Sequence, residues 1–144
     1  MRRERRGFAK GELHFFLPTS RAASYAPGMH ALAIGLQVFV AASIFFVWGV
    51  RYANIVEEFK QYRLPDWLRD FVGVLKITFA ILLLVGIDRP RAAMLGGVGI
   101  AVLMAGAFIT HLRVKNPAFK MLPCVLLLMV SLAIAYLNYR LLHP

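Results

Sequence analysis

The stretch ALAIGLQVFVAASIFFVWGV, residues 31–50, contains no charged side chain. A helix needs about 20 apolar residues to cross a hydrocarbon core about 30 Å thick. Residues 92–110 and 121–139 are equally free of charge, and a fourth apolar stretch, 68–87, is interrupted near its middle by Lys76. The pattern predicts an all-α transmembrane four-helix bundle, with helices at about 31–50, 67–87, 91–112 and 120–140.

Composition supports one membrane-embedded domain. The chain has 144 residues, of which 60% are hydrophobic and 17% charged, whereas soluble domains carry about 25% charged residues. We expect residues 31–140 to form the four-helix domain. Residues 1–30 form a basic segment that we expect to be interfacial or flexible.

The net charge of +10 does not indicate nucleic-acid binding, because the positive side chains flank the apolar stretches or lie in the N-terminal segment. Lys and Arg beside membrane helices set orientation and contact anionic lipid. With four spans, nine Lys and Arg residues lie on the side of the two termini and seven lie on the other side. This excess predicts that both termini are in the cytoplasm. We expect the membrane to be a bacterial cytoplasmic membrane. The nine are Arg2, Arg3, Arg5, Arg6, Lys10, Arg21, Arg89, Arg91 and Arg140; the seven are Arg51, Lys60, Arg63, Arg69, Arg113, Lys115 and Lys120.

The first loop, about residues 51–66, has an amphipathic pattern. Ile55, Phe59 and Tyr62 share one helical face, which predicts a short helix lying at the membrane surface. Pro65 ends that helix and suits the first turn of the next one.

Small residues recur every four positions in the third apolar stretch. Ala93, Gly97, Ala101 and Ala105 fall on one face, and such a face allows two membrane helices to approach closely. We expect this face to pack against a neighbouring helix.

Lys76 is the most informative single residue for function. An ammonium group near the centre of a bilayer costs about 2.5–3.5 kcal/mol on insertion scales. Either the side chain extends along its helix to the interface, or it meets a ligand anion or an acidic residue of a neighbouring protein. We expect that it does not face open lipid.

Polar residues also gather at the end of the third helix. Thr110, His111 and Arg113 lie there, on the predicted side of Arg51. They would form either a salt-bridged rim or a mouth that holds an anionic or quinone-like head group. No multi-histidine metal set is expected, because His14, His30 and His143 fall on the other side of this topology.

No catalytic constellation is visible in the sequence. It contains no phosphate-binding loop, nucleophile elbow or zinc-protease motif, so we assign no catalytic residues. The single cysteine, Cys124, cannot form an internal disulfide, and we expect it to be a buried structural residue.

Two segments resemble a known family. FFVWGVRYANIVEEFKQYRLPDWLRDFVGVLKITFAILLL, residues 45–84, and AFITHLRVKNP, residues 107–117, resemble the core and the T-H-L-R helix ending of the DoxX-like family. The resemblance covers residues 31–140. It implies a four-helix membrane bundle with cytoplasmic termini. It also directs attention to Arg51, Pro65, Gly73, Thr110, His111 and Arg113.

The family's name derives from a quinone-linked sulfur-oxidising enzyme, and most members have no defined activity, so the resemblance implies a fold more than a function. Our first hypothesis is a non-catalytic accessory subunit or packing module of a larger redox or energy-converting membrane assembly, with lipid and protein partners or a homo-oligomer. The alternative is a quinone- or lipid-linked redox component that binds a head group near His111 and Arg113. Transport by this chain alone is disfavoured, because it lacks broken, repeated helices.

Overall fold

The computed structural model describes residues 27–143 and is helical throughout this range, with short connections. The helices are α2 (Pro27–Val50), α3 (Tyr52–Gln61), α4 (Asp66–Val85), α5 (Pro90–Arg113) and α6 (Ala118–Leu142). The all-helical prediction is therefore confirmed for this part of the chain. The predicted basic segment falls almost entirely outside the described residues.

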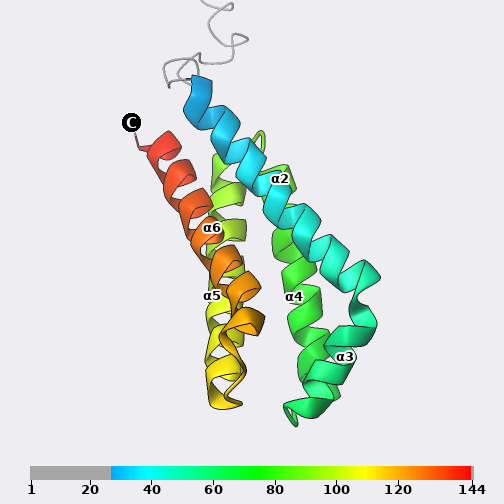
Figure 1. The fold of residues 1–144 in the computed structure, drawn as a ribbon. Coiled ribbons are helices and arrows are strands. Elements are labelled where there is room, and N and C mark those ends of the chain that lie inside the picture. Colours follow the sequence, from blue (N-terminus) through cyan, green and yellow to red (C-terminus); the bar gives the residue numbers. More distant parts are fainter. Residues whose placement is uncertain (1–26, 144) are drawn as a thin grey trace, which may run out of the picture.

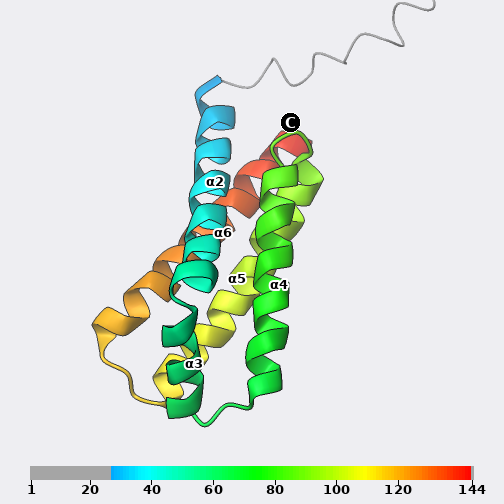
Figure 2. The ribbon, with the colours of Figure 1, turned by 90° about the vertical axis from the view of Figure 1, so that its right-hand side faces the viewer.

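The four longer helices run in alternating directions along the chain (Figures 1 and 2). α5 packs against α4 and α6, and α2 packs against α4 and α6. The start of α2, the turn between α4 and α5 and the end of α6 lie at one end of the molecule, which we call the terminal end. Helix α3 and the connection between α5 and α6 lie at the other end, which we call the loop end.

The core lies where α2, α4, α5 and α6 meet. Its fully buried side chains include one from each of these helices: Val40, Leu83, Ile100 and Ile134. Large apolar side chains also remain exposed on every one of these helices, among them Phe39, Phe46, Phe71, Ile81, Val102, Ile109, Leu122 and Met129. Monomeric soluble proteins rarely expose apolar patches larger than a few hundred Å², so these outer faces are suited to lipid.

Three described helices are long and apolar enough to cross a membrane: Gly28–Val50, Pro90–Arg113 and Ala118–Leu142. Helix α4 is not among them, because Arg69, Asp70 and Lys76 interrupt its apolar sequence. It nevertheless packs between α2 and α5. The prediction of four membrane spans is thus supported for three helices, and the fourth span stays a prediction.

Two turns at the loop end have the same construction. Arg63 and Lys115 adopt left-handed backbone angles, with φ of 54° and 52°. The next N–H in each turn, of Leu64 and of Asn116, donates to the carbonyl oxygen five residues earlier, at 3.0 and 3.1 Å. This is the Schellman ending of a helix, and proline follows directly in both cases. These turns fix where Tyr62 and Asn116 lie.

Candidate functional site

A polar cluster joins the two turns at the loop end. Asn116 Nδ2 lies 2.6 Å from the Tyr62 hydroxyl oxygen and 2.8 Å from His111 Nδ1. The rings of Tyr62 and His111 meet edge to face, with centroids 5.8 Å apart. We call Tyr62, His111 and Asn116 the loop-end cluster; all three side chains are partly buried. It holds the end of α3 against the end of α5.

The hydrogen bonds define the roles of the three groups. An amide nitrogen carries two protons, so Asn116 donates one to Tyr62 and one to His111. In the tautomer in which His111 Nδ1 accepts this bond, the ring carries its proton on Nε2. The Nε2–H and the Tyr62 O–H are the donors left for a further partner.

The other polar residues predicted at this end do not join the cluster. Thr110 Oγ1 donates to the carbonyl oxygen of Gly106, at 3.0 Å. Arg51 lies exposed between α2 and α3, and Arg113 is exposed at the end of α5. Neither arginine forms an ion pair with residues 27–143.

Other charged residues at the loop end, on α3 and at the start of α4, are ion-paired. Arg69 contacts Asp66 at 2.8 Å and Asp70 at 3.0 Å, and Lys60 lies 3.7 Å from Glu57. The carboxylates are mostly exposed, and exposed pairs of this kind contribute about 0–1 kcal/mol each. His111 and Arg113 line neither of the two grooves described below, and the choice between a rim and a head-group mouth stays a prediction.

Lys76 lies beside an aromatic ring. Its Nζ is 5.8 Å from the centroid of the Trp48 ring, a distance at which a cation and an indole attract each other. The side chain is partly buried, and no carboxylate among residues 27–143 lies within 4 Å of Nζ. Gly73 makes this arrangement feasible, because a Cβ there would overlap the Trp48 ring.

A groove opens on the α2–α4 face next to this pair. It has a volume of about 400 Å³ and is lined by Trp48 and by five residues of α4: Asp70, Gly73, Val74, Ile77 and Thr78. The Thr78 hydroxyl is satisfied by the carbonyl oxygen of Val74, at 2.8 Å. The lining is thus mainly apolar, and its charged member is Asp70, which is paired with Arg69. We call it the α2–α4 groove.

The small-residue face of α5 is largely inside the bundle. Ala93, Gly97 and Ala101 are buried, whereas Ala105 is only partly buried. A Cβ on Gly97 would lie 2.9 Å from the Ser131 carbonyl oxygen of α6. The sequence pattern missed Gly96, whose Cβ would lie 2.9 Å from the Phe79 carbonyl oxygen of α4. Adjacent glycines thus allow α5 to approach two different helices.

Three polar side chains are buried within the bundle. Asn138 Nδ2 donates to the carbonyl oxygen of Ile134, at 2.9 Å. Gln37 Oε1 and Ser131 Oγ have no hydrogen-bond partner among the described residues. Cys124 is buried, as a structural role requires, and its thiol donates to the carbonyl oxygen of Met104 at 3.0 Å. Within residues 27–143, no group of three or more His, Cys, Asp or Glu side chains could hold a metal ion.

Tyr62 was predicted to lie on the amphipathic face of its helix, whereas no pattern in the sequence marks Asn116 as its partner. Asn116 precedes Pro117 in a turn, and an Asn-Pro pair signals only the turn itself. Its two partners lie 54 and 5 residues away in sequence. The contact between the two loops therefore has no local signal.

The environment of Tyr62 predicts a loss of stability at alkaline pH. Burial raises the pKa of the Tyr62 hydroxyl, the Glu58 carboxylate raises this pKa further, and the Asn116 hydrogen bond opposes the increase. The folded state therefore retains this proton when the unfolded state releases it, so stability falls as the pH rises above about 10. Tyr62→Phe should lower the free energy of unfolding by about 1 kcal/mol at neutral pH. Its free energy of unfolding should also fall less at alkaline pH than that of the wild type. Urea unfolding in detergent from neutral to alkaline pH measures both.

Tyr136→Phe is the matched control, because Tyr136 is exposed on α6. It should leave the alkaline loss unchanged. An equal alkaline loss in wild-type protein and in Tyr62→Phe would contradict the assignment to Tyr62.

Comparison with known proteins identifies similar chains. The model of the DoxX-like family matches residues 31–133, which is more than half of the chain. The uncharacterized protein YdgD of Bacillus subtilis (strain 168) is 29% identical over 112 residues, covering 74% of this chain and 98% of that protein. No solved structure matches the chain. The family match includes Lys76, the loop-end cluster and the α2–α4 groove.

Proposed function

Because the chain belongs to the DoxX-like family of membrane proteins, we propose that it is a four-span, non-catalytic accessory subunit of a larger membrane assembly. The α2–α4 groove, together with Lys76, whose ammonium group contacts Trp48 of the groove lining, is the observation that supports this function most. A helix of a partner protein would fill the groove, and an acidic side chain of that helix would reach Lys76. We expect the assembly to be a redox or energy-converting one in a bacterial cytoplasmic membrane, with both termini of this chain in the cytoplasm.

The energetics favour a protein partner over bare lipid at this face. A lysine inside the hydrocarbon costs about 2.5–3.5 kcal/mol, and the contact with Trp48 offsets about 2 kcal/mol when desolvated. A carboxylate from outside the chain would remove the remaining cost. The groove lining also suits a helix, because it is mainly apolar and the Thr78 hydroxyl is already hydrogen-bonded within α4.

The length and charge pattern of α4 support a fourth span. Helix α4 has 20 residues, which is enough to cross about 30 Å of hydrocarbon at about 1.5 Å per residue. Arg69 and Asp70 lie in its first turns, near the loop end, where their ion pair would sit at head-group depth. Lys76 is then the one charged residue of α4 left within the hydrocarbon.

The accessory function can be tested by photo-crosslinking in the membrane. A photoreactive amino acid at Thr78, in the groove, should form a discrete cross-link to another protein or to a second copy of this chain. The same amino acid at Val102, which is exposed on α5, is the control and should react mainly with lipid. Cross-linking to lipid alone at both positions would refute the proposed partner.

A second function is favoured by one specific observation, the donors of the loop-end cluster. The Tyr62 O–H and His111 Nε2–H lie at the end of α5, where a quinone carbonyl or a lipid head group would be at hydrogen-bonding depth. In this alternative the chain is a quinone- or lipid-linked redox component, and Arg113 adds positive charge at the entrance. Gentle extraction followed by mass spectrometry distinguishes the two: stoichiometric quinone on the isolated chain supports the alternative, and a stable protein complex supports the accessory subunit.

A further inference from the structure

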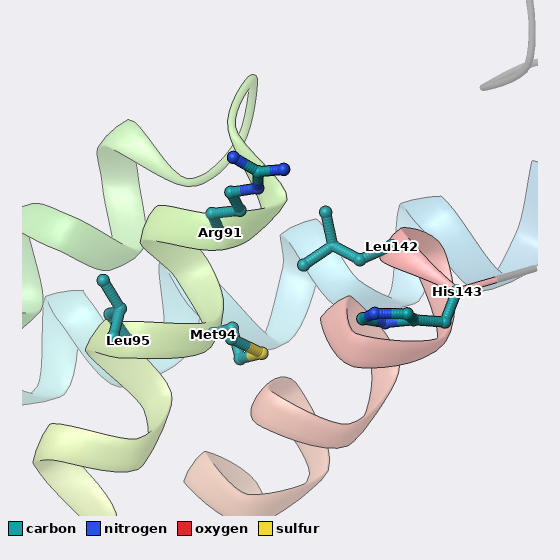
Figure 3. A pocket seen from close by; sticks show the side chains of 5 residues that line it. All are labelled: Arg91, Met94, Leu95, Leu142 and His143. Carbon is teal, nitrogen blue, oxygen red and sulfur yellow. The ribbon is translucent and has the colours of Figure 1, made fainter.

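A second groove lies at the terminal end, far along the chain from the residues discussed so far. It has a volume of about 330 Å³ and lies between the first turns of α5 and the end of α6. Arg91, Met94 and Leu95 line it from α5, and Leu142 and His143 line it from the other side. Figure 3 shows Arg91 and Leu142 extending toward each other above Met94. We call it the terminal groove.

The polar side of the terminal groove is positively charged. Arg91 is exposed and forms no ion pair with residues 27–143. It lies in the first turn of α5, which contains no acidic residue, and the N-terminus of a helix itself attracts anions. Arg89 and Arg140 add positive charge at the same end, against the single aspartate Asp88.

His143 is held in a defined orientation. Its Nδ1 donates to the carbonyl oxygen of Tyr139, at 3.2 Å, and its ring lies over that of Tyr139, with centroids 4.6 Å apart. Because Nδ1 is engaged, Nε2 is the ring atom available to a molecule in the groove. The histidine therefore adds a second polar group opposite Arg91.

The apolar side of the groove continues toward the middle of the bundle. Met94 and Leu95 lie one turn further along α5, and Leu142 faces them. Helices α5 and α6 are both long and apolar enough to cross the membrane. At the terminal end, α5 begins at Pro90 and α6 ends at Leu142. The groove thus lies where hydrocarbon meets head groups, with its charge on the outer side and its apolar surface on the inner side.

We infer that the terminal groove binds one anionic phospholipid, with the phosphate on Arg91 and an acyl chain against Met94 and Leu142. A phospholipid fits better than free phosphate, because most of the lining is apolar and would remain exposed around a small anion. Guanidinium binds phosphate oxygens through two parallel hydrogen bonds, which lysine cannot do. This inference does not depend on the partner proposed for the α2–α4 groove.

Native mass spectrometry of the full chain tests the inference. Protein is reconstituted in nanodiscs of zwitterionic lipid containing a minor fraction of phosphatidylglycerol, then released and compared with Arg91→Gln and Arg140→Gln. Wild-type protein and Arg140→Gln should each retain one phosphatidylglycerol. Arg91→Gln should retain it at least about tenfold less, as the loss of a charged hydrogen bond implies.

Arg140→Gln is the matched control, because this substitution removes the same charge from the same end of the molecule, and Arg140 does not line the groove. Equal retention in Arg91→Gln and wild-type protein would overturn the inference, as would an equal loss in both variants, which would mean unspecific charge attraction. Displacement of the lipid by millimolar inorganic phosphate would also overturn it, since the acyl chain would then contribute nothing. Circular dichroism confirms that each variant is folded.

Discussion

Gly97→Leu should strongly destabilise the bundle. A Cβ at this position would lie 2.9 Å from the Ser131 carbonyl oxygen and 3.2 Å from the Ala135 amide nitrogen. Both atoms belong to the backbone of α6, so they cannot rotate away and the whole helix has to move. Overpacking typically costs about 1–3 kcal/mol, and we expect leucine to reach the upper part of that range. Thermal unfolding in detergent measures the loss.

Alanine substitutions give a sharper form of this test. A Cβ on Gly106 would meet nothing within 4 Å, so Gly106→Ala should stabilise α5 by up to about 1 kcal/mol through helix propensity. Gly97→Ala gains the same propensity but meets the α6 backbone, and should be destabilising overall. Equal melting temperatures for the two alanine variants would show that α6 does not lie against Gly97.

Lys76→Met should have the largest effect on assembly. Removing the only charge in the middle of α4 should leave the chain itself as stable as before or more stable, because an ammonium in hydrocarbon costs about 2.5–3.5 kcal/mol. The same substitution should abolish the cross-link from Thr78 to the partner, whose acidic side chain would lose its counter-charge. Cross-linking yield and thermal unfolding, measured on the same preparation, separate these two effects.

Two controls frame the Lys76 experiment. Lys120→Met removes an exposed lysine in the first turn of α6 and should leave the cross-link unchanged. Lys76→Arg keeps the positive charge and should retain a large part of the cross-linking yield. An undiminished cross-link in Lys76→Met would mean that the partner does not recognise this charge.

The sequence predicted the helices well, because their signals are local. Long apolar runs and the prolines at positions 65 and 90 mark helices near their observed bounds. Helix α3 was also predicted from its own amphipathic pattern. The left-handed residues Arg63 and Lys115 were not predicted, since glycine is the usual residue in such endings.

The sites were less predictable, because they depend on contacts between distant residues. The spacing of four residues identified Gly97 on one face of α5 and missed Gly96 on the neighbouring face, since a single stripe describes a single partner helix. His111 was identified from its motif, whereas its hydrogen bond to Asn116 requires the fold of the following turn. Lys76 was recognised as exceptional from burial cost alone, but its neighbour Trp48 is known only from the packing of α2 on α4.

We propose that α4 crosses the membrane as the fourth span, despite its charged residues. Cysteine labelling in intact cells tests it most directly. In a Cys124→Ser background, Lys60→Cys and Asp88→Cys place one thiol at each end of α4, both at exposed positions. A membrane-impermeant maleimide added outside should label one of these thiols and reach the other only after the membrane is permeabilised. Labelling of both thiols, or of neither, in intact cells would contradict it, because the two ends of α4 would then lie on the same side.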